Sequence, residues 1–472
     1  MNLLLLLLLL LSLAAAPASA ADLLASVVTV VSVDDQGEPR RQGLGVAVGP
    51  DGVVLTSAAI LAHSRGGLIK TGGGAMHFLS RVVRWDSLQD LAQVQAEGVG
   101  LPPVSVARLL ALNPPEKVRV ALRQGKALVL QEAQVTTVYP LSPRLVILHL
   151  APAALAAEPG APLFNAKGEL VGMLHVLAGQ GAPVEGLKFY LGLDPSLIAP
   201  PRKTPAPEEP RLEEILKYPP AGYHAAFWDG VGASLEKKWQ LAEERFSLVL
   251  QYARDLPEAW YGRGVARYHR QDFVGAARDL KEAARLSPRY GLAFLWLGRA
   301  WQGLGKEKEA RQAYGEAVTL TPELAEAWFQ LGLMAYQAGN LGEAALYLEK
   351  MKGKPPQDRE RWWYLGNIYR ALRRQEDALE AYRKATEADP RYVAAYLEGG
   401  RLLLDLGRAP EAVTWLEKGV GLAPSLATLR YYLALAHLNT WNRARAWEEY
   451  FALQKLDPTL AASLAPLLEQ SR

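Results

Sequence analysis

A period of 34 residues runs through the second half of the chain and restricts its fold more than any other feature. Four series of residues recur at this spacing in a single register. They are the prolines Pro288, Pro322, Pro356, Pro390, Pro424 and Pro458, the small residues Gly264, Gly298, Gly332, Gly366, Gly400 and Ala434, the alanines Ala276, Ala310, Ala344, Ala378, Ala412 and Ala446, and the mostly aromatic series Trp260, Phe294, Trp328, Trp362, Tyr396 and Arg430. Such a period is typical of solenoid proteins, in which each repeat is one small unit that stacks on its neighbours.

Each repeat is expected to hold two amphipathic helices. The small residue of the first helix and the alanine of the second let the two backbones approach closely, and the aromatic residue fills the space beside them. The proline ends the second helix because it cannot donate an intrahelical hydrogen bond. One helix pair cannot bury its apolar face alone, so the pairs are expected to stack into an all-α superhelix.

These residues resemble the tetratricopeptide repeat (TPR) family. The segments Trp328-Phe329-Gln330-Leu331-Gly332 and Trp362-Trp363-Tyr364-Leu365-Gly366 fit the pattern of that family's first helix. Six clear repeats are predicted over 257–458, and a weaker one from about residue 223 has Gly230, Ala242 and Phe246 in phase but no proline at position 254. Residues 458–472 can form the capping helix that a solenoid needs.

The resemblance implies that a protein or peptide partner binds along the concave face, mainly through the first helix of each pair. The family's inward-facing positions fall here on Tyr261, Tyr268, Arg299, Gln302, Phe329, Tyr336, Trp363, Asn367, Arg370, Arg401 and Tyr431. Aromatic residues and arginine dominate interface hot spots. The alternative for each position is packing between repeats. Asn367 matches part of the family's carboxylate clamp, but Trp363 stands where a lysine is expected, so carboxylate capture is not predicted.

The N-terminal half has the sequence pattern of an all-β domain. Short β-branched runs at 27–31, 52–56, 145–148 and 170–174 are bounded by turn residues, which predicts a barrel or sandwich. Residues 22–198 resemble chymotrypsin-fold serine proteases of the Deg/HtrA type. The resemblance rests on segments 43–56, 86–94 and 159–172 and on Gly186-Leu187-Lys188-Phe189-Tyr190, which is similar to the family's closing strand. It implies a chymotrypsin-like double barrel.

Carried over residue by residue, the resemblance places the general base at Ala59, the acid at Asp90 and the nucleophile at Pro159. Acyl transfer by this route needs a hydroxyl and a base that takes its proton. Alanine and proline supply neither, and proline has no N–H to bind the oxyanion. The sequence therefore predicts a pseudoprotease, with Asp90 as a structural carboxylate. His63, Ser57, Ser64, Ser142 and His175 match no catalytic position of the family, and a triad formed among them is the alternative.

The N-terminal segment indicates export, and a proline-rich segment in the middle of the chain indicates a boundary between two domains. The apolar run from Leu3 to Leu11, followed by Ala18-Ser19-Ala20, predicts a signal peptide over 1–20, with an uncleaved anchor as the alternative. No further membrane span is expected in the mature chain. Residues 199–212 are rich in proline and predict an extended linker before the repeat region at 213–472.

Composition excludes several kinds of function. The net charge is +3 without a basic run, so no nucleic-acid partner is expected. The chain has no cysteine, the seven histidines are scattered, and no phosphate-binding loop is present, so neither a metal nor a cofactor is predicted. The function predicted is an exported binding scaffold in the periplasm, at the cell envelope or outside the cell. The alternatives are a serine endopeptidase whose repeats recruit substrate and a structural component of an envelope or secretion complex.

Overall fold

The computed structural model describes residues 19–34, 36–49, 51–61, 64, 66–86, 91–107, 114–142, 145–151, 158–175, 189–192, 223–351 and 358–470. Most of the predicted signal peptide, the predicted linker, Asp90 and His63 lie outside these ranges. The chain divides into two compact units, residues 1–296 and 297–472, and the boundary falls inside a helix of the repeat array.

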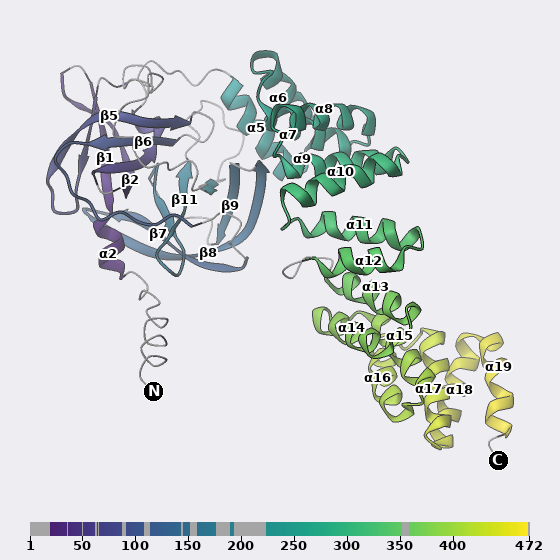
Figure 1. Ribbon diagram of the computed structural model, residues 1–472. Coiled ribbons are helices and arrows are strands. Elements are labelled where there is room, and N and C mark those ends of the chain that lie inside the picture. The colour runs from purple at the N-terminus through teal and green to yellow at the C-terminus, as the bar shows by residue number, and fades with distance from the viewer. Residues whose placement is uncertain are drawn as a thin grey trace, which may run out of the picture. The chain divides into compact units, whose positions relative to one another are not determined.

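The first sheet closes into a barrel of antiparallel strands in the order β1–β2–β3–β6–β5–β4 (Figure 1). Its strands are β1 (Val27–Val33), β2 (Pro39–Gly49), β3 (Val53–Ser57), β4 (Gly66–Lys70), β5 (Met76–Asp86) and β6 (Leu91–Ala96). Val28 and Val30 of β1 lie in the barrel core, whereas Val31 and Val33 are partly exposed. This alternation arises because successive side chains of a strand point to opposite faces.

The second sheet closes in the order β10–β11–β12–β9–β8–β7. Its strands are β7 (Glu116–Gln124), β8 (Ala127–Ser142), β9 (Leu145–Ala151), β10 (Pro162–Phe164), β11 (Leu170–His175) and β12 (Phe189–Gly192). The four runs predicted as strands fall in β1, β3, β9 and β11, and Phe189 and Tyr190 of the predicted closing strand begin β12. The expected double barrel is confirmed.

An apolar core joins the two barrels. Leu44, Val46 and Leu55 of the first barrel are buried in the same cluster as Val120 and Leu163 of the second. Transfer of such surface out of water contributes about 25 cal/mol per Å² of apolar area. The two barrels therefore form one packed domain, with the ends of β2 and β3 and the turn before β10 along their contact.

Paired helices make up the rest of the described chain. They are α5 (Tyr223–Leu235) and α6 (Trp239–Tyr252), α7 (Pro257–His269) and α8 (Phe273–Leu286), α9 (Gly291–Gly303) and α10 (Glu307–Leu320), α11 (Ala325–Gln337) and α12 (Leu341–Glu349), α13 (Asp358–Ala371) and α14 (Gln375–Ala388), α15 (Val393–Asp405) and α16 (Ala409–Leu422), and α17 (Ala427–Asn439) and α18 (Arg443–Leu456), followed by α19 (Pro458–Gln470). Leu464 and Leu468 of α19 pack into one cluster with Leu453 of α18. Among the helices described, none is both long and apolar enough to cross a membrane.

The small residue of each first helix makes room for a side chain of the second helix. A Cβ placed on Gly264 would lie 2.7 Å from Leu280 Cγ, and one on Gly366 would lie 2.4 Å from Tyr382 Cε1. Real Cβ atoms do not approach carbon this closely, so any larger residue would push the paired helices apart. This confirms the close approach that the sequence predicts for the small-residue series.

The mostly aromatic series has a second role that the sequence did not show. Several of its members donate a hydrogen bond to the backbone carbonyl six residues earlier, in the turn between repeats. These bonds run from Trp260 Nε1 to Arg254 (2.8 Å), from Trp328 Nε1 to Pro322 (2.9 Å), from the Tyr396 hydroxyl to Pro390 (3.3 Å) and from Arg430 Nε to Pro424 (2.7 Å). The position therefore favours a long side chain with a donor, which explains why an arginine can stand in it.

Buried tyrosines connect several helix pairs, and they differ in how their hydroxyls are satisfied. The Tyr382 hydroxyl donates to Asn367 Oδ1 at 2.8 Å, and the Tyr314 hydroxyl donates to Gln302 Oε1 at 2.9 Å. Tyr290 is fully buried beside Tyr261, and its hydroxyl has no hydrogen-bond partner among the described residues. Desolvation raises the pKa of Tyr290 well above its usual value, and the neighbouring Tyr261 adds to this rise.

This difference predicts opposite effects for the same substitution. Tyr290→Phe is expected to raise the free energy of unfolding by about 1 kcal/mol, because it removes a buried hydroxyl that lost its water and gained no partner. Tyr382→Phe is expected to lower the free energy by about 1–3 kcal/mol, because Asn367 Oδ1 would stay buried without its donor. Urea unfolding of the full chain, followed by circular dichroism, compares the two. Equal losses from both substitutions would contradict this account.

Candidate functional site

The position of the predicted general base lies at the end of a buried strand. β3 ends at Ser57 and continues into the short helix α3 (Ala58–Leu61). The backbone carbonyl of Ala59 accepts a hydrogen bond from Arg41 Nη1 at 2.8 Å. A Cβ placed on Gly43 of β2 would lie 2.4 Å from Ile60 Cδ1, so this glycine admits the side chain that follows Ala59.

The position of the predicted nucleophile lies in the turn before β10. The carbonyl of Pro159 accepts a hydrogen bond from the Leu44 N–H at 2.9 Å, and the Gly160 N–H donates to the Leu174 carbonyl at 3.0 Å. Gly160 has a φ of +75°, and a Cβ on it would lie 2.1 Å from the Leu44 carbonyl oxygen. A glycine is therefore required both by the backbone conformation and by the close approach of β2.

The short helix that contains Ala59 and the turn that contains Pro159 both border β2. The Cβ built on Gly43 would also lie 2.5 Å from the carbonyl oxygen of Pro159, so Gly43 borders both Ile60 and the turn. The same turn holds an ion pair, in which Arg123 Nε donates to Glu158 Oε1 at 2.7 Å while Arg123 Nη2 donates to Thr29 Oγ1 at 2.7 Å. Arg123 thereby links the turn to β1 of the first barrel through its two partners, Glu158 and Thr29.

The chemistry available at this place is limited. The alanine side chain at 59 and the proline side chain at 159 carry no group that transfers a proton and no hydroxyl. Asp90 and His63 lie outside the described residues, as do the side chains of Ser142 and His175. Ser57 and Ser64 are buried, and the Ser64 hydroxyl donates to the Leu61 carbonyl at 2.6 Å. Within the described residues, no three His, Cys, Asp or Glu residues gather in a way that would hold a metal ion.

The second candidate site is the surface predicted on the first helices of the repeats, here called the helix-A face. In the first unit, Tyr261 of α7 is buried, with its ring centroid 5.0 Å from that of Tyr290. Tyr268 is partly exposed and lies in an aromatic cluster, 5.2 Å from Trp296 and 5.4 Å from Phe273. Of the two predicted residues on α7, only Tyr268 thus presents surface to a partner.

In the second unit, α9 and α11 carry the next predicted residues. Arg299 forms an ion pair with Glu326, and Gln302 is exposed while it accepts the hydrogen bond from Tyr314. Phe329 is buried with its ring centroid 6.1 Å from that of Tyr364. These contacts link α11 to α9 and to α13.

Around α13, the side chains of Tyr336, Trp363, Tyr364 and Arg370 form a surface that is here called the strip. The ring centroid of Tyr364 lies 5.4 Å from that of Tyr336 and 4.9 Å from that of Trp363. Arg370 Nη1 lies 3.2 Å from Glu398 Oε2, and Asn367 is buried where Tyr382 holds it. Tyr336, Trp363 and Arg370 are only partly buried. The strip therefore combines partly exposed aromatic rings with a paired arginine.

The strip continues onto α15 and α17. The exposed Arg401 lies over the ring of Tyr432, with its Cζ atom 6.0 Å from the ring centroid. Tyr431 contacts the same ring at a centroid distance of 5.4 Å. A cation over an aromatic face is worth about 0.5–1 kcal/mol at an exposed site. Arg401 is thus oriented by its neighbour while its charge stays accessible.

Sequence reasoning missed the residues that receive these contacts. Trp296, Tyr364, Glu398 and Tyr432 occupy one position of the repeat, because they are separated by 34 residues or a multiple of it. Three of them contact the residue 28 positions earlier, in the pairs Tyr268 with Trp296, Tyr336 with Tyr364 and Arg370 with Glu398. The signal in the sequence was a second column, two residues after the mostly aromatic series, which carries a large side chain in five of the six repeats.

Comparisons with protein families match both halves of the chain. Residues 43–173 match the family of the trypsin-like peptidase domain. Residues 236–291, 295–359 and 364–427 match a tetratricopeptide repeat family.

Curated relatives match parts of the chain at low identity. Protein FlbA of Caulobacter vibrioides is 24% identical over 199 residues, which are 42% of this chain and 33% of that protein. The human protein O-mannosyl-transferase TMTC3 is 24% identical over 214 residues, 45% of this chain and 21% of that protein. The chain thus spans a third or less of the length of these relatives.

Two solved structures of TPR proteins match part of the chain. The C-terminal part of a TPR repeat-containing protein from Cytophaga hutchinsonii has a TM-score of 0.43 at 21% identity, covering 49% of this chain and 96% of that one. YrrB, described as a TPR protein with an unusual peptide-binding site, has a TM-score of 0.37 at 19% identity and covers 40% of this chain and all of that one.

Proposed function

We propose that this chain, which carries a trypsin-like peptidase domain and a tetratricopeptide-repeat array, is an exported scaffold that holds a partner protein without cleaving it. The repeat array supplies the binding function, since tetratricopeptide repeats are protein-binding and peptide-binding modules. The observation that carries the proposal is the strip of partly exposed aromatic rings and arginines on α11, α13, α15 and α17.

The strip has the composition of an interface hot spot. Tyr336, Trp363 and Tyr364 offer large, rigid contact area at a low cost in side-chain entropy. Arg370 and Arg401 add charge that is already oriented by Glu398 and Tyr432. Because these contacts exist before a partner binds, little ordering is needed on binding, which favours affinity. A peptide or a helix of the partner fits such an elongated surface.

Two substitutions of the repeat surface test this proposal. The double variant Tyr336→Ala with Arg401→Glu is expected to weaken retention of the partner from an envelope fraction by about tenfold or more, because it removes an aromatic anchor and reverses an accessible charge. The control is Arg391→Glu, which makes the same charge reversal at an exposed arginine outside the helix-A face. Equal retention by both variants, or no specific partner for the parent protein, would count against the proposal.

Lack of cleavage is the second part of the proposal. The residues at the positions predicted for the base and the nucleophile are Ala59 and Pro159. Neither side chain can take a proton or attack a carbonyl, and Pro159 lacks the N–H that would bind an oxyanion. The family match at 43–173 favours the alternative of a serine endopeptidase whose repeats recruit substrate.

Export is the third part. The apolar run from Leu3 to Leu11 and the small residues before Ala21 support a cleaved signal peptide. Cleavage there would remove Ser19, which caps α2 (Ala20–Ala25) by accepting from the Asp22 N–H at 3.1 Å. N-terminal sequencing of protein recovered from the periplasm of an expression host is expected to begin at Ala21. A chain that starts at Met1 and sediments with membranes would support an anchor.

A further inference from the structure

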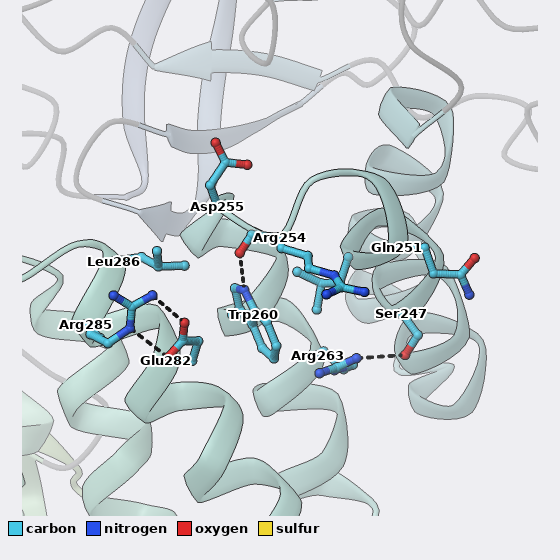
Figure 2. Close-up of a pocket in the computed structure, with 10 residues that line it drawn as sticks. Ser247, Gln251, Arg254, Asp255, Trp260, Arg263, Glu282, Arg285 and Leu286 are labelled. Carbon is cyan, nitrogen blue, oxygen red and sulfur yellow. Dashed lines mark hydrogen bonds and ion pairs between the residues drawn. The ribbon is translucent and has the colours of Figure 1, made fainter.

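Two arginines depart from the repeat pattern, and both line the same pocket. Arg254 stands where the following turns have proline, and Arg263 stands where four of the five following first helices have a leucine, namely Leu297, Leu331, Leu365 and Leu433. The pocket has a volume of about 680 Å³ and lies within the first unit, between α6, α7 and α8 (Figure 2). Substitutions that bring two guanidinium groups to one cavity indicate a site that the other repeats do not share.

The walls of the pocket separate into an apolar and a polar part. Leu250 of α6, Trp260 of α7 and Leu286 of α8 provide apolar surface. Ser247 and Gln251 lie on the α6 side, and Figure 2 shows Arg254 extending toward them on the side of Trp260 where Arg263 also lies. The carboxylate of Asp255 points away from Trp260. The guanidinium groups of Arg254 and Arg263 therefore lie on the same side of Trp260, and Arg285 lies on the other side beside Glu282.

The guanidinium groups differ in how far their hydrogen-bond donors are used. Arg285 is paired with Glu282 through two bonds of 2.9 and 2.7 Å. Arg263 donates from Nε and Nη2 to Asp279 at 2.7 and 3.0 Å, which leaves Nη1 with one long bond of 3.4 Å to Ser247 Oγ. The Arg254 side chain is exposed and has neither a hydrogen bond nor an ion pair within the described residues.

Arg254 is nevertheless held in place by its backbone. Its carbonyl accepts the hydrogen bond from the indole N–H of Trp260 at 2.8 Å, and the Arg263 guanidinium lies 4.8 Å from the centre of the Trp260 ring. The indole thus positions both arginines, one through a hydrogen bond to its backbone and the other through contact with its ring face. A partly built anion site results, with the donors of Arg254 and Arg263 Nη1 still available.

The pocket is separate from the helix-A face. Trp260 and Arg263 are three residues apart on α7, so they share one side of the helix. Tyr261 and Tyr268 are seven residues apart and share another side, roughly 120° away at 100° per residue. A ligand in the pocket contacts the second helices α6 and α8, which the predicted partner surface does not use.

We propose that this pocket binds a peptide carboxylate whose neighbouring side chain is apolar. Arg254 and Arg263 Nη1 donate to the carboxylate, because a planar guanidinium matches the geometry of that group. Trp260, Leu250 and Leu286 contact the apolar side chain. Asp255 and Glu282 also line the pocket, and their carboxylates repel a doubly charged phosphate more strongly than a singly charged carboxylate. The site rests on the repeat fold and is independent of the partner surface proposed above.

Three labelled peptides test the proposal on the full-length protein by fluorescence anisotropy. The first is Gly-Ser-Gly-Leu with a free C-terminal carboxylate, the second is the same peptide amidated, and the third is amidated Gly-Ser-Glu-Leu. The first or the third peptide is expected to bind at least about tenfold more tightly than the second. Preference for the first assigns the ligand to a chain terminus, and preference for the third assigns it to an acidic side chain.

Two variants identify the site. Arg254→Gln keeps a polar side chain in an exposed turn and is expected to remove the tenfold preference, whereas Arg289→Gln, at an exposed arginine that does not line the pocket, is expected to keep it. The variant Tyr336→Ala with Arg401→Glu should also keep the preference, which separates this test from that of the helix-A face. Binding that ignores the carboxylate, binding that survives Arg254→Gln, or no binding of any peptide would overturn the proposal.

Discussion

Purified full-length protein is expected to leave casein and fluorogenic peptides uncut, with a turnover on the order of 10⁶ below that of an active serine protease. The reason is chemical. A serine protease needs a hydroxyl, a base in contact with it and N–H donors for the oxyanion, and these act as one unit. Ala59 and Pro159, at the positions predicted for the base and the nucleophile, supply neither the base nor the hydroxyl, and Pro159 has no N–H.

The assay separates scaffold from enzyme when it includes an inhibitor and a barrel variant. Trace hydrolysis from a contaminating protease should persist unchanged in a Ser57→Ala variant and in the Asp90→Asn variant. Turnover that a serine-directed inhibitor abolishes, and that also disappears on one of these substitutions, would establish the endopeptidase alternative. Labelling by a fluorophosphonate probe reports the same distinction without a substrate, and no labelling is expected.

Asp279→Ala is expected to cause the largest loss of stability in the repeat array. Asp279 of α8 is fully buried, and its carboxylate accepts hydrogen bonds from Arg263 and from Arg267 Nη1, the latter at 2.7 Å. Removing one partner of a buried ion pair leaves the remaining charge uncompensated and costs about 3–5 kcal/mol. Hydrogen exchange of peptides from residues 257–286, read by mass spectrometry, gives the opening free energy of α7 and α8 directly.

A double variant provides the internal control. Arg263→Leu combined with Asp279→Ala places a leucine and an alanine where the next repeat has Leu297 and Ala313. A well-packed apolar pair often equals or exceeds a buried ion pair in stability, so most of the loss should be recovered. Arg267 keeps its bond of 2.9 Å to Glu243 in this variant.

An exposed pair sets the scale for this comparison. Glu380→Ala removes a partner of Arg383 on the surface of α14, where both side chains are about half exposed. Exposed pairs contribute about 0–1 kcal/mol, so the change in opening free energy should stay within that range. Asp279→Ala with an effect no larger than that of Glu380→Ala would show that the buried charges do not stabilise α7 and α8.

The repeat period predicted the helix pairs and their close packing because it averages over many units. Gly264 and Gly366 make room for the second helix in different repeats. Their recurrence at the same position of the repeat is what made this role predictable from the sequence. The same averaging hides the positions at which a single repeat departs from the common pattern. Arg263 and Asp279 break the pattern together, yet they are 16 residues apart and on different helices, so only the folded chain pairs them.

The helix-A face shows a similar limit. The predicted positions are those that line the groove in an average repeat. An average repeat does not predict the side-chain contacts between one repeat and the next. Tyr261, Phe329 and Asn367 are buried, because each meets a large side chain from a neighbouring helix or turn. Tyr364 contacts both Tyr336 and Trp363, but the sequence did not predict its role. The reason is that the residue type at its position of the repeat differs in nearly every unit.

The barrel domain was predicted from short glycine-containing segments whose spacing follows the strands. Gly43 and Gly160 are required where β2 meets α3 and the turn before β10, so their positions reflect close backbone contacts rather than catalysis. The ion pair of Arg123 with Glu158 could not be read from the sequence, because 35 residues separate its members and they come together only where β7 pairs with β10 in the folded second barrel.

The most direct test of a scaffold that binds without cutting is the fate of a captured partner. A photo-crosslinkable amino acid in place of Arg401 on α15 should crosslink the partner, and mass spectrometry should recover that partner at its full length after prolonged incubation with the protein. The same probe in place of Arg391 should crosslink it at least about tenfold less. Recovery of the partner as fragments, or equal crosslinking from both positions, would contradict the account.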